Sequence, residues 1–421
     1  MAFFSGTLLY FGPIPQYEGS FSNIFVHLPP KITTAMITNK AIEAFRQIET
    51  PFYYYDMALL QQTLQECSKQ AGLYGFQVHY AIKANDDPRI LAMVRDYGFG
   101  VDCVSGGEVK LALDAGFAAE KIVFAGVGKT DREINLALDA GIGCFNVESI
   151  PELEVIDALA RAKGVQAPVC IRVNPDIDAH THRYITTGLE ENKFGISAWA
   201  FDELVAALRA ATNIAFKGLH LHIGSQITIM EPFKLECKRA LEIVAKFREA
   251  GFEVTDLNLG GGLGVDYDYP SLNPVAPFEA WFGTVAENLP VGPGQTVHFE
   301  PGRALVAQCG YLISRAVFVK KGKERKFVIL DAGMNDLIRP ALYGARHYVE
   351  NLTSRGGKLR YDVVGPICES SDTWGEGLLL PATSRGDLFA IGTAGAYGQV
   401  MSMRYNQRPF AKAYYSDEIL K

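Results

Sequence analysis

Short runs of alternating apolar and polar residues recur along the chain up to about residue 302, and longer amphipathic stretches separate them. The runs cover residues 79–84, 100–105, 122–127, 144–149, 169–174, 219–224, 257–262 and 297–302. Segments between them, such as "DELVAALRAATN" and "LECKRALEIVAKFREAG", repeat apolar residues at helical spacing. Strands that alternate with helices in this way predict an α/β fold of the (β/α)8 barrel type, with a doubly wound sheet as the alternative.

The pattern changes after residue 302. Longer β-rich runs, "YLISRAVFVKK", "KFVILDAG", "LRYDVVGP" and "DLFAIGTAGAY", follow one another with turn residues between them. We therefore expect two domains. The barrel is predicted over residues 45–302, and a C-terminal β-sandwich or β-barrel domain over residues 303–421.

The polar positions of the predicted barrel strands carry residues with reactive chemistry. Because successive side chains of a strand point to opposite faces, the apolar set is expected to pack on helices and the polar set to face the barrel interior. Lys83, Asp102, Arg172, His222 and Glu300 stand towards the C-terminal ends of their runs, where barrel enzymes build active sites. A solvent-exposed polar face of an antiparallel sheet is the alternative, and the helical spacers argue against it.

Two glycine-containing turns follow neighbouring predicted strands. "NLGGGLGV" at 258–265 includes Gly261 and Gly262, and "HIGSQ" at 222–226 adds the hydroxyl of Ser225. Backbone N–H groups of such turns can approach and wrap a phosphate. The glycines fail the dinucleotide pattern G-x-G-x-x-G, because Val265 stands where the third glycine belongs. Each turn alone could be a tight βα connection, but the two together favour a phosphate cup.

A phosphate cup with an inward lysine and an inward glutamate indicates pyridoxal 5'-phosphate. Lys83 would bind the cofactor aldehyde, and burial is expected to favour its neutral, nucleophilic amine. Glu300 would keep the pyridine nitrogen protonated. Asp102 and Arg172 would support these groups from behind, and His222 would lie flat against the cofactor ring. A structural ion pair of the lysine with Asp102 or Glu300 is the alternative.

The charge and the cysteine content of the chain limit the classes of binding partner that we expect. The 421 residues carry a net charge of -7, and no basic run is longer than "KKGKERK" at 320–326, so nucleic-acid binding is not expected. Seven cysteines without C-x-x-C spacing suit neither a disulfide framework nor a structural zinc site. The opening "MAFFSGTLLYFGPIP" has no basic start and is interrupted by Gly and Pro, unlike a signal peptide. We expect a cytoplasmic protein that acts on a small molecule, with no metal and no membrane contact.

Several motifs resemble those of a known family. They are "YAIKAN", "HIGSQ", "NLGGGLGV", "EPGR", "DAGMNDLIRPALYGARH", "GPICESSD" and "GAYG", in this order between about Phe52 and Pro409. They are similar to motifs of the fold-type III pyridoxal phosphate decarboxylases, specifically the diaminopimelate decarboxylases. Met403 and Arg404 depart from the pattern, since Ser and Asn are expected there.

This resemblance implies an alanine-racemase-like barrel, a β-domain completed by residues 1–44, and a homodimer with active sites shared between subunits. It also implies decarboxylation of meso-2,6-diaminopimelate to L-lysine and CO2, the last step of lysine biosynthesis. The implied cofactor-binding residues are Lys83, His222, Ser225, Gly261, Gly262, Glu300, Gly302, Arg303 and Tyr397. The implied substrate-binding residues are Arg303, Arg339, Tyr343, Glu369 and Tyr397. Lys83 and Cys368 would be the catalytic residues, and Cys368 and Glu369 would reach in from the partner subunit, the cysteine as proton donor.

The two arginines bear on the substrate. A strong cation on the departing carboxylate would stabilise the ground state more than the products, so Arg303 and Arg339 suggest a second, distal carboxylate. Glu369 suits a distal ammonium group. Ornithine, arginine, carboxynorspermidine and amino-acid racemisation on the same barrel remain alternatives, as does a cofactor carrier without catalysis. "GPICESSD" argues against a racemase or a carrier, and only the arginines argue against a polyamine-type decarboxylase.

Overall fold

Eight parallel strands close into a barrel in chain order. In this computed structural model the chain is described over residues 37–175, 177 and 193–421. The barrel strands are β2 (Gln77–Ala81), β3 (Gly100–Cys103), β4 (Ile122–Phe124), β5 (Cys144–Val147), β6 (Ala167–Arg172), β7 (Ile214–His220), β8 (Asp256–Asn258) and β9 (Thr296–Phe299). Pairing of Val78 with Phe299 closes the ring. The predicted (β/α)8 barrel is confirmed, and the doubly wound alternative is excluded.

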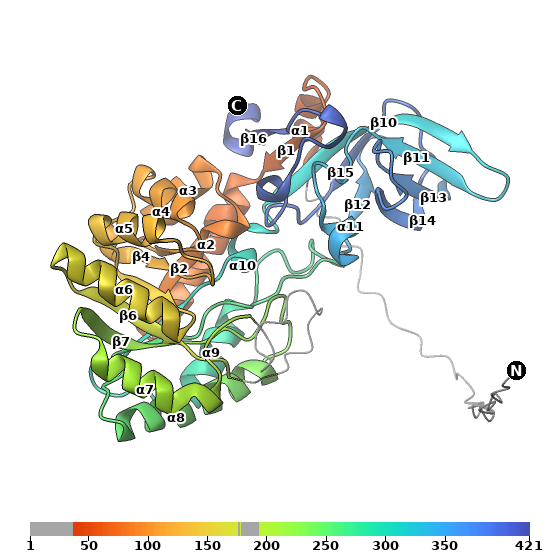
Figure 1. Ribbon diagram of the computed structural model, residues 1–421. Coiled ribbons are helices and arrows are strands. Elements are labelled where there is room, and N and C mark those ends of the chain that lie inside the picture. The colour runs from red at the N-terminus through yellow and green to blue at the C-terminus, as the bar shows by residue number, and fades with distance from the viewer. Residues whose placement is uncertain (1–36, 176, 178–192) are drawn as a thin grey trace, which may run out of the picture. The chain divides into compact units, whose positions relative to one another are not determined.

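Helices alternate with these strands and surround them (Figure 1). They are α2 (Met57–Leu73), α3 (Pro88–Asp96), α4 (Gly106–Asp114), α5 (Asp131–Ala140), α6 (Ile150–Lys163), α7 (Phe201–Ala210), α8 (Glu231–Glu249), α9 (Phe278–Asn288) and the short α10 (Arg303–Val306). Polar side chains begin many of them: Asp56, Asp87, Ser105, Thr130 and Ser149 each accept N–H bonds of the first turn. None of the described helices is long and apolar enough to cross a membrane.

Apolar residues of the barrel strands pack outward, as the alternation predicts. Val101, Phe145, Ile171 and Leu219 are fully buried and belong to one core cluster with helix residues such as Leu153. Burial of these side chains between strand and helix stabilises the barrel by roughly 1.5–3 kcal/mol for each large side chain. The polar residues that alternate with them are left to line the interior.

A second sheet follows the barrel, in the order β12-β15-β10-β11-β13-β14. Its strands are β10 (Gly310–Lys321), β11 (Lys326–Leu330), β12 (Val349–Asn351), β13 (Lys358–Val364), β14 (Thr373–Pro381) and β15 (Leu388–Ile391), with β16 (Lys412–Tyr415) near the end of the chain. Short helices α11 (Arg339–Tyr343) and α12 (Ser416–Ile419) complete this part.

The first strand of the described residues, β1 (Phe52–Tyr55), differs from the prediction that the barrel begins at residue 45. It pairs antiparallel with β10 and parallel with β16, within the second sheet. All four of its residues are buried, so both edges and both faces of the strand need neighbours, and the second sheet provides them. The preceding α1 (Asn39–Phe45) packs its Phe45 ring on Tyr54. Residues 1–36 of the segment predicted to complete the β-domain lie outside the described residues.

A chain of polar side chains crosses the barrel interior below the C-terminal ends of the strands. His79 Nε2 lies 3.0 Å from His298 Nδ1, and His298 Nε2 lies 2.9 Å from Asp256 Oδ1. Burial, together with the neighbouring His298, lowers the pKa of His79 to about 4. His79 therefore stays neutral in the folded protein at pH values where an unfolded histidine, with a pKa of 6.5, takes up a proton.

This depressed pKa predicts acid sensitivity. The unfolded chain binds more protons than the native chain between pH 6.5 and about 4, so the contribution of His79 to stability is complete above 6.5 and is lost as the pH falls towards 4. The full loss corresponds to about 3 kcal/mol. We expect His79→Gln to flatten the decline of the unfolding free energy over this window, measured by urea denaturation at a series of pH values. Parallel curves for the two proteins would contradict the assignment.

Candidate active site

A cavity of about 750 Å³ opens at the C-terminal ends of the barrel strands and is also lined by residues that follow the barrel in sequence. Twelve of the fifteen predicted site residues line it: Lys83, Asp102, Arg172, His222, Ser225, Gly262, Glu300, Gly302, Arg303, Arg339, Tyr343 and Tyr397. Gly261, Cys368 and Glu369 are not among the lining residues. The five residues predicted from the alternation, Lys83, Asp102, Arg172, His222 and Glu300, therefore lie in one cavity at the end of the barrel where they were expected.

Lys83 lies on a turn, where the sequence pattern predicted a strand position. β2 ends at Ala81, where its pairing with β3 stops, and the single 3-10 turn η1 (Ile82–Ala84) follows with Ile82 fully buried. This turn directs the Lys83 ammonium to Asp102, with Nζ 2.5 Å from Oδ2. The lysine side chain remains 41% exposed although its ammonium lies deep among other groups, so its accessible surface faces the cavity.

The charge of Lys83 differs from the expected neutral amine. Burial lowers the pKa of Lys83, but the negative charges of Asp102 and Glu300 and the neighbouring Tyr397 outweigh burial and raise it above the usual value. The ion pair that the sequence left as an alternative is therefore present. Burial and the charge of Glu300 also raise the pKa of Asp102, while Lys83 only partly opposes them. Asp102 is the adjacent group to which the Lys83 proton can pass before the lysine acts as a nucleophile.

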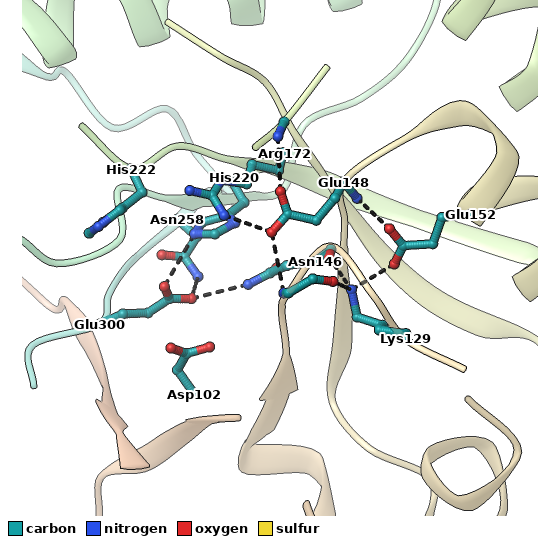
Figure 2. Close-up of polar contacts among 12 residues, drawn as sticks. Asp102, Lys129, Asn146, Glu148, Glu152, Arg172, His220, His222, Asn258 and Glu300 are labelled. Carbon is teal, nitrogen blue, oxygen red and sulfur yellow. Dashed lines mark hydrogen bonds and ion pairs between the residues drawn. The ribbon is translucent and has the colours of Figure 1, made fainter. Parts of the chain in front are cut away.

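Glu300 stands at the centre of a hydrogen-bonded floor (Figure 2). Asn146 Nδ2 and Asn258 Nδ2 donate to its Oε1 at 3.1 and 2.6 Å, and His220 Nε2 lies 3.2 Å from its Oε2. Burial alone would raise the pKa of Glu300, but His220, the charge of Lys83 and the Asn258 amide hold it well below the usual value. Glu300 is therefore ionised and fixed in direction, which suits a partner for a protonated ring nitrogen.

A buried ion pair borders this floor. Arg172 Nη1 lies 2.6 Å from Glu148 Oε1, and both side chains are buried. The same carboxylate accepts the backbone N–H groups of Gly126 and Gly195, so it joins loops that follow different strands. Arg172 lines the cavity and is held by Glu148, and its predicted supporting role stays a prediction. A further pair, Lys129 with Glu152 at 2.6 Å, lies beside it.

His222 is neutral and its ring is oriented. Burial first, then the charges of Arg172 and Lys83, lower the pKa of His222 to about 3. The backbone N–H of Gly261 donates to His222 Nδ1 at 3.2 Å, so the ring proton resides on Nε2. This contact also explains why Gly261 does not line the cavity: it packs behind the histidine and against the Glu300 carbonyl, which a Cβ would meet at 2.3 Å.

The two glycine turns lie next to each other. Ile227 N–H donates to Gly262 O at 2.9 Å, which joins the "HIGSQ" turn to the "GGGLG" turn. Gly262 has a φ of +108°, and a Cβ there would lie 2.8 Å from Gly224 O. A side chain is therefore excluded for both conformational and steric reasons. Ser225 stands at the same place, where its Oγ accepts from Arg303 Nη2 at 3.1 Å.

Two buried arginines meet at this end of the cavity. Arg303 begins α10 and Arg339 begins α11, and both donate to the hydroxyl of Tyr267, at 2.7 and 2.9 Å. Arg303 also lies 4.9 Å from the centre of the Tyr397 ring. No carboxylate of the described residues forms an ion pair with either guanidinium. Two positive charges are thus left for an anionic group that binds in the cavity.

Known proteins with a similar sequence or structure are pyridoxal-dependent decarboxylases. A family model described as the pyridoxal binding domain of pyridoxal-dependent decarboxylases matches residues 58–307. The chain belongs to this family. A diaminopimelate decarboxylase of Bacteroides thetaiotaomicron is 53% identical over 90% of this chain and 98% of its own length. The diaminopimelate decarboxylase of Helicobacter pylori complexed with L-lysine matches with a TM-score of 0.83 at 38% identity, over 89% of this chain and 93% of that one. The family inferred from the motifs is confirmed.

The cofactor of this decarboxylase family is pyridoxal phosphate, and the cavity fits it. Asp102 Oδ1, His220 Nδ1 and Arg303 Nε are buried without a hydrogen-bond partner among the described residues, so polar groups remain for a ligand. The glycine turns leave backbone exposed for a phosphate, and Glu300 is an ionised partner for the ring nitrogen. Lys83 is accessible from the same cavity for the aldehyde.

Cys368 and Glu369 lie away from the cavity of their own chain. Both are exposed, whereas the other six cysteines are buried. The backbone N–H of Cys368 donates to Asn406 Oδ1 at 3.2 Å, and Tyr405 donates to Glu369 Oε1 at 2.5 Å. Nearby, the Met403 N–H donates to Asn335 O. Met403, one of the two residues that depart from the family pattern, is therefore held through its backbone. The predicted roles of Cys368 and Glu369 stay predictions.

Tyr267 and His347 were missed by the sequence analysis, although both contact Arg339. Tyr267 stands in the loop "LGVDYDYP" after a glycine turn, where no periodic pattern marks it. Its proximity to "GGGLG" was the only available signal. Asn258 stands two residues before the first glycine, Gly260, and its amide could have been recognised as a polar residue at the end of a barrel strand.

The floor around Glu300 leads to a prediction about the decarboxylase's cofactor. Asn258→Ala removes the shorter amide bond to Glu300 Oε1, so the carboxylate is less well held for the ring nitrogen. We expect about tenfold weaker binding of pyridoxal phosphate, the worth of one hydrogen bond to a charged group. Absorbance titration of the cofactor-free protein measures this. Asn135→Ala, on an exposed face of α5, is the matched control, and equal affinities of the two variants would contradict the role of Asn258.

Proposed function

We propose that this protein decarboxylates meso-2,6-diaminopimelate to L-lysine and CO2, as a cytoplasmic homodimer with shared active sites. The main support is the pair of buried guanidiniums of Arg303 and Arg339. They line the same cavity as Lys83, and no described carboxylate neutralises them. The high identity to proteins named diaminopimelate decarboxylase supports the same reaction. All seven cysteines are unpaired, which suits a reducing compartment.

The residues of the floor hold and prepare the cofactor. When bound, pyridoxal phosphate supplies an electron sink for the pair of electrons that the departing CO2 leaves behind. Glu300 would keep a proton on the ring nitrogen, and neutral His222 would contact the ring. Lys83 would bind the aldehyde, and Asp102, whose Oδ2 lies 2.5 Å from the lysine Nζ, would take up the ammonium proton. The backbone of Gly262 and the Ser225 hydroxyl would hold the phosphate.

The arginines select the substrate. The departing carboxylate must not be neutralised strongly, so Arg303 and Arg339 bind the distal carboxylate of the substrate. Charge-assisted hydrogen bonds from guanidiniums are worth about 1.5–3 kcal/mol each. A substrate that ends in an amine alone leaves both buried guanidiniums without an anion, and this cost discriminates against ornithine and lysine. Tyr343 and Tyr397 complete the substrate side of the cavity.

The partner subunit completes the site. Cys368 and Glu369 are exposed and lie outside the cavity of their own chain, so their side chains are free to enter the cavity of a second copy. In the homodimer, the Cys368 thiol donates a proton to the α-carbon after CO2 has left, and Glu369 binds the distal ammonium of the substrate. Each active site therefore uses Lys83 from one chain and Cys368 from the other.

A substrate panel tests the reaction. The cofactor-loaded protein is incubated with meso-diaminopimelate, ornithine, arginine and lysine, and CO2 and amine products are followed. We expect CO2 and lysine from diaminopimelate, and turnover at least roughly 1,000-fold lower for the other three, because they leave the buried arginines unpaired. Comparable CO2 release from ornithine would refute the assigned substrate.

Mixing two inactive variants tests the shared site. Lys83→Ala and Cys368→Ala proteins should each be nearly inactive alone. After unfolding and refolding together, half of the dimers are expected to be mixed, and each of these has one site with both native residues, so about a quarter of the wild-type activity should return. No recovery, with both variants shown to form mixed dimers, would place Cys368 and Lys83 of one chain in the same site or remove the cysteine from the reaction.

A further inference from the structure

The hydroxyl of Tyr267 joins the two arginines of the cavity. Arg303 Nη1 and Arg339 Nη1 both donate to it, at 2.7 and 2.9 Å. The two guanidiniums carry the same charge and are only 6% exposed, so their repulsion is screened little by water. A shared acceptor between them offsets part of that repulsion and fixes their separation.

The ring of Tyr267 is also held in place. The Arg339 guanidinium carbon lies 4.9 Å and that of Arg303 5.9 Å from the ring centre. The His347 ring meets Tyr267 edge-on, with centroids 5.3 Å apart and planes at 84°. Two cations near its face and an edge contact leave the ring little freedom, so the oxygen stays between the arginines.

His347 fixes the second arginine from behind. Its Nδ1 donates to Gly392 O at 2.9 Å, so Nε2 carries no proton and accepts from Arg339 Nη1 at 2.9 Å. Burial and the Arg339 charge lower the pKa of His347 to about 3, which keeps this tautomer neutral. One nitrogen of Arg339 therefore directs one N–H to His347 and the other to Tyr267. Both partners are neutral, so the positive charge of the arginine is not cancelled.

The proton of Tyr267 has no acceptor among the described residues. The oxygen already accepts two N–H bonds, which leaves its own O–H as the remaining group, and Tyr267 lines the cavity. Burial alone would raise the pKa of Tyr267, but the two guanidiniums lower it below the usual value, which makes the hydroxyl a stronger hydrogen-bond donor.

We propose that Tyr267 is a further recognition residue of this site: its oxygen sets the spacing of Arg303 and Arg339, and its proton is donated to the carboxylate that the two arginines bind. The identity of that carboxylate, the distal one of diaminopimelate, rests on the proposed function. Tyr397 acts differently, since it offers Arg303 the face of its ring. Tyr267 thus adds a neutral donor to two charged ones, and a carboxylate is the group that accepts all three.

Tyr267→Phe tests this directly, because it keeps the ring and removes only the oxygen. In the cofactor-loaded protein we expect KM for diaminopimelate to rise about tenfold or more, the loss expected for a hydrogen bond to a charged group, with kcat changed less than about threefold. The matched control is Tyr269→Phe, two residues along the same loop and 65% exposed, which should leave both constants unchanged. Tyr267→Gln, which restores an acceptor and a donor, should recover part of the lost affinity even where the ring contacts contribute to folding.

A second readout does not depend on turnover. Pimelate, a seven-carbon dicarboxylate without amines, is titrated into the wild-type, Tyr267→Phe and Tyr269→Phe proteins in a calorimeter. We expect weaker binding only for Tyr267→Phe, by a factor similar to that in KM. Unchanged or tighter pimelate binding by this variant would overturn the proposal, because the tyrosine would then be neutral to the carboxylate or would occupy its place. If the wild-type protein fails to decarboxylate diaminopimelate but pimelate binding still depends on Tyr267, the proposed function fails and the role of the tyrosine stands.

Discussion

The buried negative charge of Glu300 is the constraint on which the site depends. A carboxylate without water is costly unless polar groups surround it, and here Asn146, His220 and Asn258 provide them from three different strands. Glu300 itself follows a fourth strand. The Glu300 carboxylate therefore joins the C-terminal ends of β5, β7, β8 and β9. The barrel must close in this register for the carboxylate to keep its hydrogen bonds. The same contacts that stabilise the fold keep the carboxylate ionised for its chemistry.

The other half of the cavity depends on contacts between the turn of Lys83 and the loop that carries Tyr397. The backbone N–H of Tyr397 donates to Ala84 O at 2.7 Å, and Asn85 Nδ2 donates to Gly395 O at 2.8 Å. Asn85 also donates to the hydroxyl of Tyr55, on the strand β1. Lys83 is thus held between the barrel and the second sheet, and α11 of the same sheet-rich part supplies Arg339. Neither part of the chain contains the whole site.

Periodicity was sufficient to predict the barrel, because strand alternation and helical spacing are local properties of the sequence. It also identified the inward residues Lys83, Asp102, Arg172, His222 and Glu300, although strand β2 ends before the lysine. It did not identify the strand Phe52–Tyr55, which belongs to the second sheet although it falls within the predicted barrel bounds, because four buried aromatic residues show no alternation. Tyr267 and His347 were missed for a related reason. Their importance comes from bonds to arginines distant in sequence, and a loop tyrosine has no local pattern that reveals such bonds.

The arrangement of charges along "EPGR" has a consequence for how the specificity of this enzyme can change. Glu300 and Arg303 are three residues apart, with Gly302 between them packed on Ala81 and Ala84 so closely that a Cβ would meet both at 3.1 Å. Any shift of Arg303 would therefore also move Glu300. Arg339 stands on a separate helix with its own support from His347. Under the proposed roles, a change at α11 leaves Glu300 in place, so new substrate preferences are more accessible by drift or design there than in the segment from Glu300 to Arg303.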